Sequence, residues 1–349
     1  MNWKSIERVL YRNANIHSSV SPFATAMLVN GDEIAWLGEE SAVAAHHDSA
    51  DRVIDMSGAF IAPVFVDAYS SALDHQSIHE AREQAASFGI GAFHDFSESD
   101  WQAVDATVVD HAGSLVYPYR AELMNPMLGV VTSSSDAEFL REAIERHISV
   151  SVVATNNDVS VLLENLEALV QSLGLAQVKA ADLRLDGVHE LSKDQLQRCE
   201  ALGIVIVANP SEFQSAATAV GLGNSIAFGS HSENFSNPWS TLRSAVFEFP
   251  EHERMTARAA FSAATRGGWR AVGRTHIGVI APGAPAHFAV WDATDVVVQT
   301  PDERVAGWST DPRSGTPGLP DVAPGVELPQ CLRTVLAGAI AFDSGALPK

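Results

Sequence analysis

The stretch LRLDGVHELSKDQLQRCEALGIVIVA (183–208) decides the fold class, because it alternates between strand and helix patterns. The short apolar runs 183–188 and 204–208 are typical of buried strands. Residues 192–203 between them have helical spacing, and Ser192 stands where an N-cap residue is favoured. Two strands joined through a helix run parallel, with a right-handed crossover. This stretch therefore predicts an α/β unit.

The same alternation extends in both directions over residues 59–273. Further strands are predicted at 61–69, 91–96, 114–119, 128–131, 149–155 and 225–230. Helices are predicted at 75–89, 136–147, 159–173 and 256–273, and another helix opens at Asn237-Pro238. Strands that alternate with helices about eight times predict a (β/α)8 TIM-type barrel. The weak helix signal over 97–135 leaves an abbreviated barrel open.

Both chain ends show strand patterns instead. An Asn30-Gly31 turn separates apolar runs at 27–29 and 34–37, which is a strong hairpin signal, and a short strand follows at 52–55. After residue 273, strands are predicted at 278–280, 286–291, 296–299 and 334–341. Residues 1–58 and 274–349 are therefore expected to form a small β-sandwich domain beside a barrel domain of residues 59–273. Residues 309–330 are expected to be an ordered surface loop or lid.

Composition narrows the possible partners. The 349 residues include 22 basic and 43 acidic side chains, giving a net charge of −21. Such a charge repels nucleic acid and anionic membrane surfaces, so neither is an expected partner. Cys199 and Cys331 stand far apart and form neither a disulfide framework nor a metal motif. The sequence begins without a signal-peptide pattern and has no membrane-length apolar run, so a cytoplasmic location is expected.

Three stretches resemble the amidohydrolase superfamily. They are RVIDMSGAFIAPVFVDAYSS (52–71), HIGVIAPGAPAHFAVWDA (276–293) and CLRTVLAGAIAFDSG (331–345). The likeness is greatest to amidohydrolase family 3, in the form common in actinobacteria. The resemblance implies a barrel with a metal centre at its C-terminal mouth and a sandwich built from both chain ends. It also implies hydrolysis of an amide or related C–N bond by metal-activated water, with an aspartate on the eighth strand as base.

The positions of the family's metal ligands are changed in this chain. Tyr69 and Ser71 replace the first-strand His-x-His, Val153 and Gly187 replace the histidines of strands five and six, and His231 replaces the eighth-strand aspartate. Valine and glycine offer no ligand atom, and hydroxyls bind zinc poorly compared with imidazole. The resemblance therefore implies a degenerate metal site, no expected cofactor and a pseudoenzyme.

A rebuilt site remains the alternative. His94, His189 and His231 each follow a predicted strand, at the end where barrel active sites lie. Together with Asp67 or Glu233 they could hold zinc or another divalent metal, and His231 alone could act as an acid or base near neutral pH. The expected lining of the barrel mouth is Asp67, Tyr69, Ser71, His94, Val153, Asp186, Gly187, His189 and Glu233.

Three functions follow from these patterns. The first is a non-catalytic binding or regulatory protein that takes a small-molecule ligand, forms a homodimer or pairs with an active paralogue. The second is an active hydrolase of a small amide-type substrate, with its site rebuilt around the three histidines. The third is a folded remnant without a ligand. The sequence does not choose the substrate or ligand.

Overall fold

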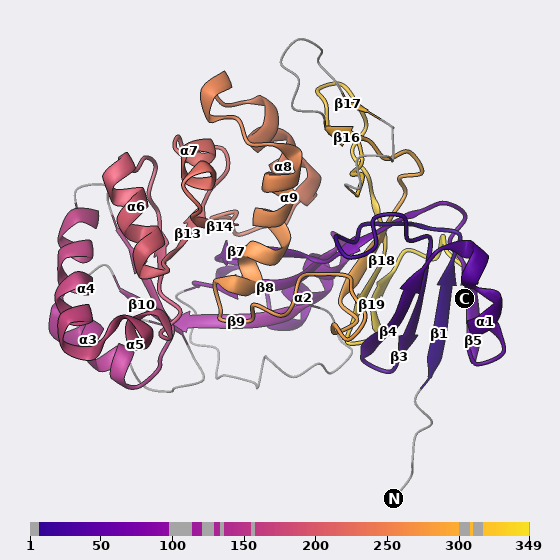
Figure 1. Ribbon diagram of the computed structural model, residues 1–349, viewed down its shortest axis with the longest axis horizontal. Coiled ribbons are helices and arrows are strands. Elements are labelled where there is room, and N and C mark those ends of the chain that lie inside the picture. The colour runs from indigo at the N-terminus through magenta and orange to yellow at the C-terminus, as the bar shows by residue number, and fades with distance from the viewer. Residues whose placement is uncertain are drawn as a thin grey trace, which may run out of the picture.

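The central element is an eight-stranded parallel sheet (Figure 1). The computed structural model describes residues 7–97, 114–120, 129–132, 136–154, 158–299, 308–309 and 317–348. The strands follow one another in sequence order across the sheet. They are β7 (Phe65–Ser70), β8 (Ile90–Asp95), β9 (Leu115–Arg120), β10 (Gly129–Thr132), β11 (Val150–Val153), β12 (Arg184–Asp186), β13 (Val205–Ala208) and β14 (Ser225–Phe228). The predicted α/β class is confirmed.

The two outer strands of this sheet, β7 and β14, are linked at their carboxyl ends. Ser70 and Ser232 form an isolated parallel bridge. The backbone N–H of His231 donates to the Tyr69 carbonyl at 2.9 Å, and that of Ser71 donates to the Ser232 carbonyl at 3.1 Å. The segment that follows β14 therefore lies beside the end of β7.

Helices connect most of the strands (Figure 1). They are α2 (Ile78–Ser87), α3 (Ala137–Glu145), α4 (Val159–Leu173), α5 (Leu175–Lys179), α6 (Lys193–Leu202) and α7 (Ala216–Gly221). Three more helices follow the last strand of the sheet: α8 (Pro238–Phe247), α9 (Ala257–Ser262) and α10 (Gly268–Arg270). Ser192 caps α6 in a reciprocal capping box with Gln195, and Asn237 caps α8 ahead of Pro238, as their sequence positions predict. No helix in the described part of the chain is long and apolar enough to cross a membrane.

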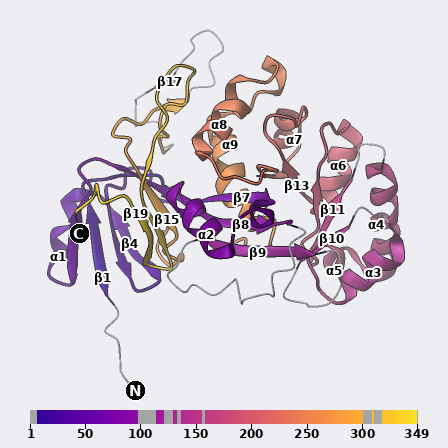
Figure 2. The same ribbon diagram turned by 180° about the vertical axis from the view of Figure 1, so that it is seen from behind.

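Strands from both chain ends form two further sheets at one end of the molecule (Figures 1 and 2). One holds β1 (Arg8–Arg12), β3 (Ala26–Asn30), β4 (Glu33–Gly38) and β5 (Arg52–Asp55). The other holds β2 (Asn15–Ile16), β6 (Phe60–Pro63), β15 (Phe288–Trp291), β18 (Cys331–Leu336) and β19 (Ala339–Asp343). One hydrophobic cluster joins them, and the rings of Tyr11 and Phe288 meet edge to face at 5.2 Å within it.

The predicted strand 61–69 is wrong in its extent, because it is two strands in different sheets. β6 pairs with β15 and β2, whereas β7 pairs with β8. Proline lacks the N–H that a continuing ladder needs, so Pro63 ends β6. The backbone N–H of Phe65 then donates to the Gly89 carbonyl, where the next pairing begins.

Other predicted boundaries also shift. The strand expected at 334–341 is part of a hairpin of β18 and β19, because Ala337 and Gly338 both take positive φ and turn the chain. The strand expected at 278–280 is irregular. The helix expected at 256–273 contains a π-helical turn, Ala263–Gly267. Of the predicted lid, residues 310–316 lie outside the described residues, and Leu319 and Val322 are buried.

Candidate functional site

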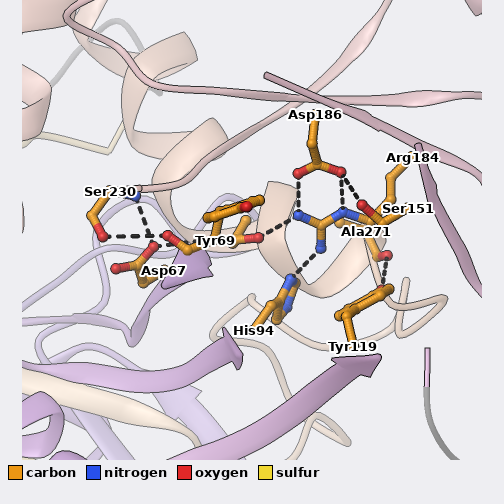
Figure 3. Close-up of polar contacts among 10 residues, drawn as sticks. Asp67, Tyr69, His94, Tyr119, Ser151, Arg184, Asp186, Ser230 and Ala271 are labelled. Atoms are coloured by element: carbon orange, nitrogen blue, oxygen red, sulfur yellow. Dashed lines mark hydrogen bonds and ion pairs between the residues drawn. The ribbon is translucent and has the colours of Figure 1, made fainter. Parts of the chain in front are cut away.

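A buried ion pair occupies the carboxyl-end half of the eight-stranded sheet (Figure 3). Arg184 and Asp186 are two residues apart on β12, so their side chains share one face of the strand. The guanidinium donates from Nε to Asp186 Oδ2 at 2.9 Å and from Nη2 to Oδ1 at 2.5 Å. Ser151 Oγ on the adjacent strand β11 donates to Oδ2 at 2.6 Å. The charges are therefore paired bidentately, the geometry that stabilises such a pair most.

The same guanidinium reaches His94 on β8. Arg184 Nη1 lies 2.6 Å from His94 Nδ1, and Nη2 also donates to the Ala68 carbonyl on β7. Because arginine can only donate, Nδ1 accepts and a neutral ring keeps its proton on Nε2. Burial and the neighbouring cation hold the pKa of His94 well below its usual range. Nε2 itself is buried and has no hydrogen-bond partner in the part of the chain that the structure describes.

Aromatic rings stack beside this ion pair. The rings of His231 and Tyr69 lie 4.0 Å apart, those of Tyr69 and Phe96 also 4.0 Å, and those of Phe96 and Tyr119 4.7 Å. The Arg184 guanidinium carbon lies 4.9 Å from the centroids of both Phe96 and Tyr119. These four rings form a column, which we call the ring column, and it fills space at this end of the sheet.

His231 belongs to the ring column rather than to a cluster of metal ligands. Its backbone takes φ 51°, a left-handed conformation uncommon outside glycine, and this places the ring against Tyr69. Burial lowers the pKa of His231. The imidazole is therefore mainly neutral near pH 7 and could accept a proton from a bound ligand.

Asp67 forms a second polar site between β7 and the segment after β14. Its carboxylate accepts from the backbone N–H of Ser230 at 2.9 Å and from that of Tyr69 at 3.2 Å (Figure 3). Burial raises the pKa of Asp67 to about 6. The carboxyl borders a cavity of about 40 Å³ that Ser236 and Thr241 also line. A water needs ~10–15 Å³ of such volume, so a few waters fit there and a substrate does not.

The remaining predicted site residues lie apart from the ion pair. His189 is 62% exposed and lies 3.7 Å from Glu212, while Glu233 lies 3.0 Å from His75 Nε2 near the surface. Val153 is half-buried and Gly187 takes φ 77°. Sequence reasoning missed Arg184 as the centre of the site, together with Ser151, Phe96 and Tyr119. The sequence signal that could have found this site is the two-residue spacing of Arg184 and Asp186 on a buried strand, which places both side chains on one face.

Comparison with known proteins identifies the family. The sequence model described as amidohydrolase family matches residues 90–342. The chain belongs to the amidohydrolase family. The predicted family resemblance is thereby confirmed, and no curated protein sequence matches this amidohydrolase-family chain significantly.

Solved structures share the fold across nearly the whole chain. A triazine hydrolase from Arthobacter aurescens is 14% identical with a TM-score of 0.64, covering 97% of this chain and 95% of its own. A zinc-bound adenosine deaminase from Xanthomonas campestris is 14% identical with a TM-score of 0.63, covering 98% and 94%. An ochratoxinase from A. niger is 14% identical with a TM-score of 0.61, covering 98% and 97%. At this identity the likeness concerns the fold alone.

The described side chains at the positions compared with the family's metal ligands offer few atoms that could bind a divalent metal. Within the described residues, no three His, Cys, Asp or Glu side chains are grouped closely enough to hold one. Tyr69 is stacked in the ring column, and Val153 and Gly187 carry no ligand atom. Of the described buried groups that could bind a metal, Asp186 and His94 accept hydrogen bonds from Arg184, and Asp67 accepts them from backbone N–H groups. A zinc site needs three or four converging ligands.

Proposed function

We propose that this chain is an amidohydrolase-family protein without the metal-dependent hydrolytic centre, acting as a non-catalytic binding or regulatory protein. The observation that carries the proposal is the bidentate pairing of Arg184 with Asp186, extended to His94. These hydrogen bonds occupy the Asp186 carboxylate and His94 Nδ1, so neither group is free to bind a divalent ion.

The proposal includes the family's architecture. β8 and β12 stand four places apart in the sheet, which would be ~19 Å in a flat sheet. The 2.6 Å contact between Arg184 and His94 requires the sheet to curl until these strands face each other. With the bridge between Ser70 and Ser232, this supports a (β/α)8 barrel. The shared core of the two smaller sheets supports a β-sandwich formed by residues 1–58 and 274–349 together with β6, which extends the first segment to residue 63.

Other parts of the proposal rest on the sequence patterns. The chain is proposed to be cytoplasmic and to bind a small molecule, a second copy of itself or an active paralogue. The alternative of a hydrolase rebuilt around three histidines has less support. His94 Nδ1 is committed to Arg184, and His189 lies exposed beside Glu212.

Metal analysis of the full chain tests the proposal. The protein would be purified without chelators from cells supplied with zinc, manganese and iron, and its metal content measured by mass spectrometry. We expect far less than one ion per chain and no turnover of amide, ester or lactam substrates. The proposal would be overturned if the wild-type protein holds about one ion per chain and has measurable turnover, and His231→Ala loses both. That result would favour the rebuilt site.

A further inference from the structure

A second cavity, of about 180 Å³, lies away from the ion pair and the ring column. Pro63, which precedes β7, lines it, whereas the ring column lies at the carboxyl end of that strand. Pro63 ends β6 and the chain then enters β7 at Phe65, so the cavity lies toward the amino end of β7, opposite the end where the ring column lies. The polar side chains that line the cavity are His17, Ser19, Arg258, Ser262, Thr265 and Arg266.

This lining is cationic and, among the residues that the structure describes, contains no carboxylate. Among the described residues, neither Arg258 nor Arg266 forms an ion pair with an acidic side chain. Some other arginines in that part of the chain pair with carboxylates, as in Arg184–Asp186 and Arg198–Glu167, and others, such as Arg243 and Arg254, donate to backbone carbonyls, whereas the guanidinium groups of Arg258 and Arg266 do neither. In a protein with 43 acidic side chains against 22 basic ones, two arginines left unpaired at one cavity indicate a place for a negative ligand.

Arg266 adds a second observation. Its Nε is buried and has no hydrogen-bond partner among the described residues. A buried donor without an acceptor is destabilising, so a ligand or water that accepts from this Nε would stabilise the site. Arg266 also belongs to the π-helical turn Ala263–Gly267, a conformation that occurs frequently at functional sites.

The residues around His17 limit the cavity to small ligands. His17 Nδ1 lies 3.0 Å from the Gly318 carbonyl, and its ring packs at 4.7 Å from that of Phe261, which closes one wall. Arg258, Ser19 and Ser262 are exposed, so the cavity opens to solvent on their side. A cavity of ~150 Å³ is known to hold benzene, so a molecule of that size fits here.

We propose that this cavity binds a small oxyanion, a carboxylate or a phosphate, held between Arg258 and Arg266. Guanidinium forks match the oxygens of both groups and can bind them bidentately. The hydroxyls of Ser19 and Ser262 can supply further donors. The walls come from residues 17–19, 63, 258–266 and 278–280, so the ligand joins the chain ends to the eight-stranded part. The site does not depend on whether the ion-pair region is catalytic.

Titration calorimetry of the full chain tests the site with two probes, inorganic phosphate and malonate, at ionic strength held constant with sodium chloride. We expect saturable binding of at least one probe. Each of Arg258→Ala and Arg266→Ala is expected to weaken it about tenfold or more, as the loss of a charge-assisted hydrogen bond predicts. Arg141→Ala is the matched control, because it removes the same charge from an exposed position on α3.

The outcomes are distinct. Binding of phosphate alone assigns a phosphate ligand, and binding of malonate alone assigns a carboxylate ligand. The proposal is overturned if neither probe shows saturable binding. It is also overturned if Arg258→Ala, Arg266→Ala and Arg141→Ala bind the probe with equal affinity. Arg258 is exposed, so Arg258→Ala decides the question even where circular dichroism shows that Arg266→Ala is misfolded.

Discussion

Replacing Arg184 by methionine should strongly destabilise the protein. The change keeps a long side chain but removes the cation that pairs with Asp186 through two hydrogen bonds. Both side chains of the pair are fully buried. Asp186 would keep only its bond from Ser151 and would be left as an uncompensated charge in the interior.

The magnitude follows from this burial. Breaking a buried pair by removing one partner costs about 3–5 kcal/mol, mostly from the charge that remains. Removing that charge as well should restore part of the stability in the double variant Arg184→Met/Asp186→Asn. The amide oxygen that replaces the carboxylate there can still accept a hydrogen bond from Ser151. We expect the double variant to be more stable than Arg184→Met by about 2 kcal/mol.

Urea unfolding measures both variants. Far-UV circular dichroism and tryptophan fluorescence should be followed together, since coincident transitions justify a single free energy of unfolding. Arg141→Met is the control, because its partner Glu145 lies 3.8 Å away at the surface and such pairs contribute about 0–1 kcal/mol. A loss below about 1 kcal/mol for Arg184→Met would refute the buried pair as the centre of this site.

Three further changes test separate features. Burial raises the pKa of Asp67 in the folded protein to about 6 from 3.8. The contribution of Asp67 to the free energy of unfolding therefore falls as pH rises from about 4 to about 6, by about 3 kcal/mol in all. Asp67→Asn should remove that pH dependence, and parallel pH profiles for wild type and variant would contradict it. Gly267→Ala should destabilise by about 3 kcal/mol in thermal unfolding, because a Cβ there would lie 2.1 Å from the Ile226 carbonyl oxygen. Gly221→Ala, which faces open space, is its control and should be neutral or stabilising by up to about 1 kcal/mol. His231→Ala should leave metal content unchanged, and a drop from one ion per chain to none would show that the residue is a ligand.

Local signals predict the elements more reliably than their extents. The caps Ser192 and Asn237 are set by residues within one turn, and both are confirmed. The split at Pro63 depends on a strand some 225 residues further on, β15, which pairs with β6 rather than with the barrel region. Short-range patterns cannot show which of two sheets an apolar run will join.

The candidate site illustrates the same limit. The sequence predicts His94 near a strand end, and the structure places it one residue before the end of β8, yet its partner is an arginine four strands away. The spacing of Arg184 and Asp186 shows that they share a face, but the register of the intervening strands decides what they meet. The ring column likewise joins side chains from four separate segments, at residues 69, 96, 119 and 231.

The ion pair also stabilises the interior of the eight-stranded sheet. A buried carboxylate such as Asp186 needs a positive partner, and the guanidinium of Arg184 supplies it from the protein itself. Arg184 and the ring column take up space in that region, and the arginine-lined cavity lies away from them. The arginine-lined cavity is open and independent of the pair, so Arg258→Ala should leave the free energy of unfolding unchanged while Arg184→Met lowers it. If Arg184→Met stays folded but loses anion binding as well as stability, the ion pair and the arginine-lined cavity are not independent.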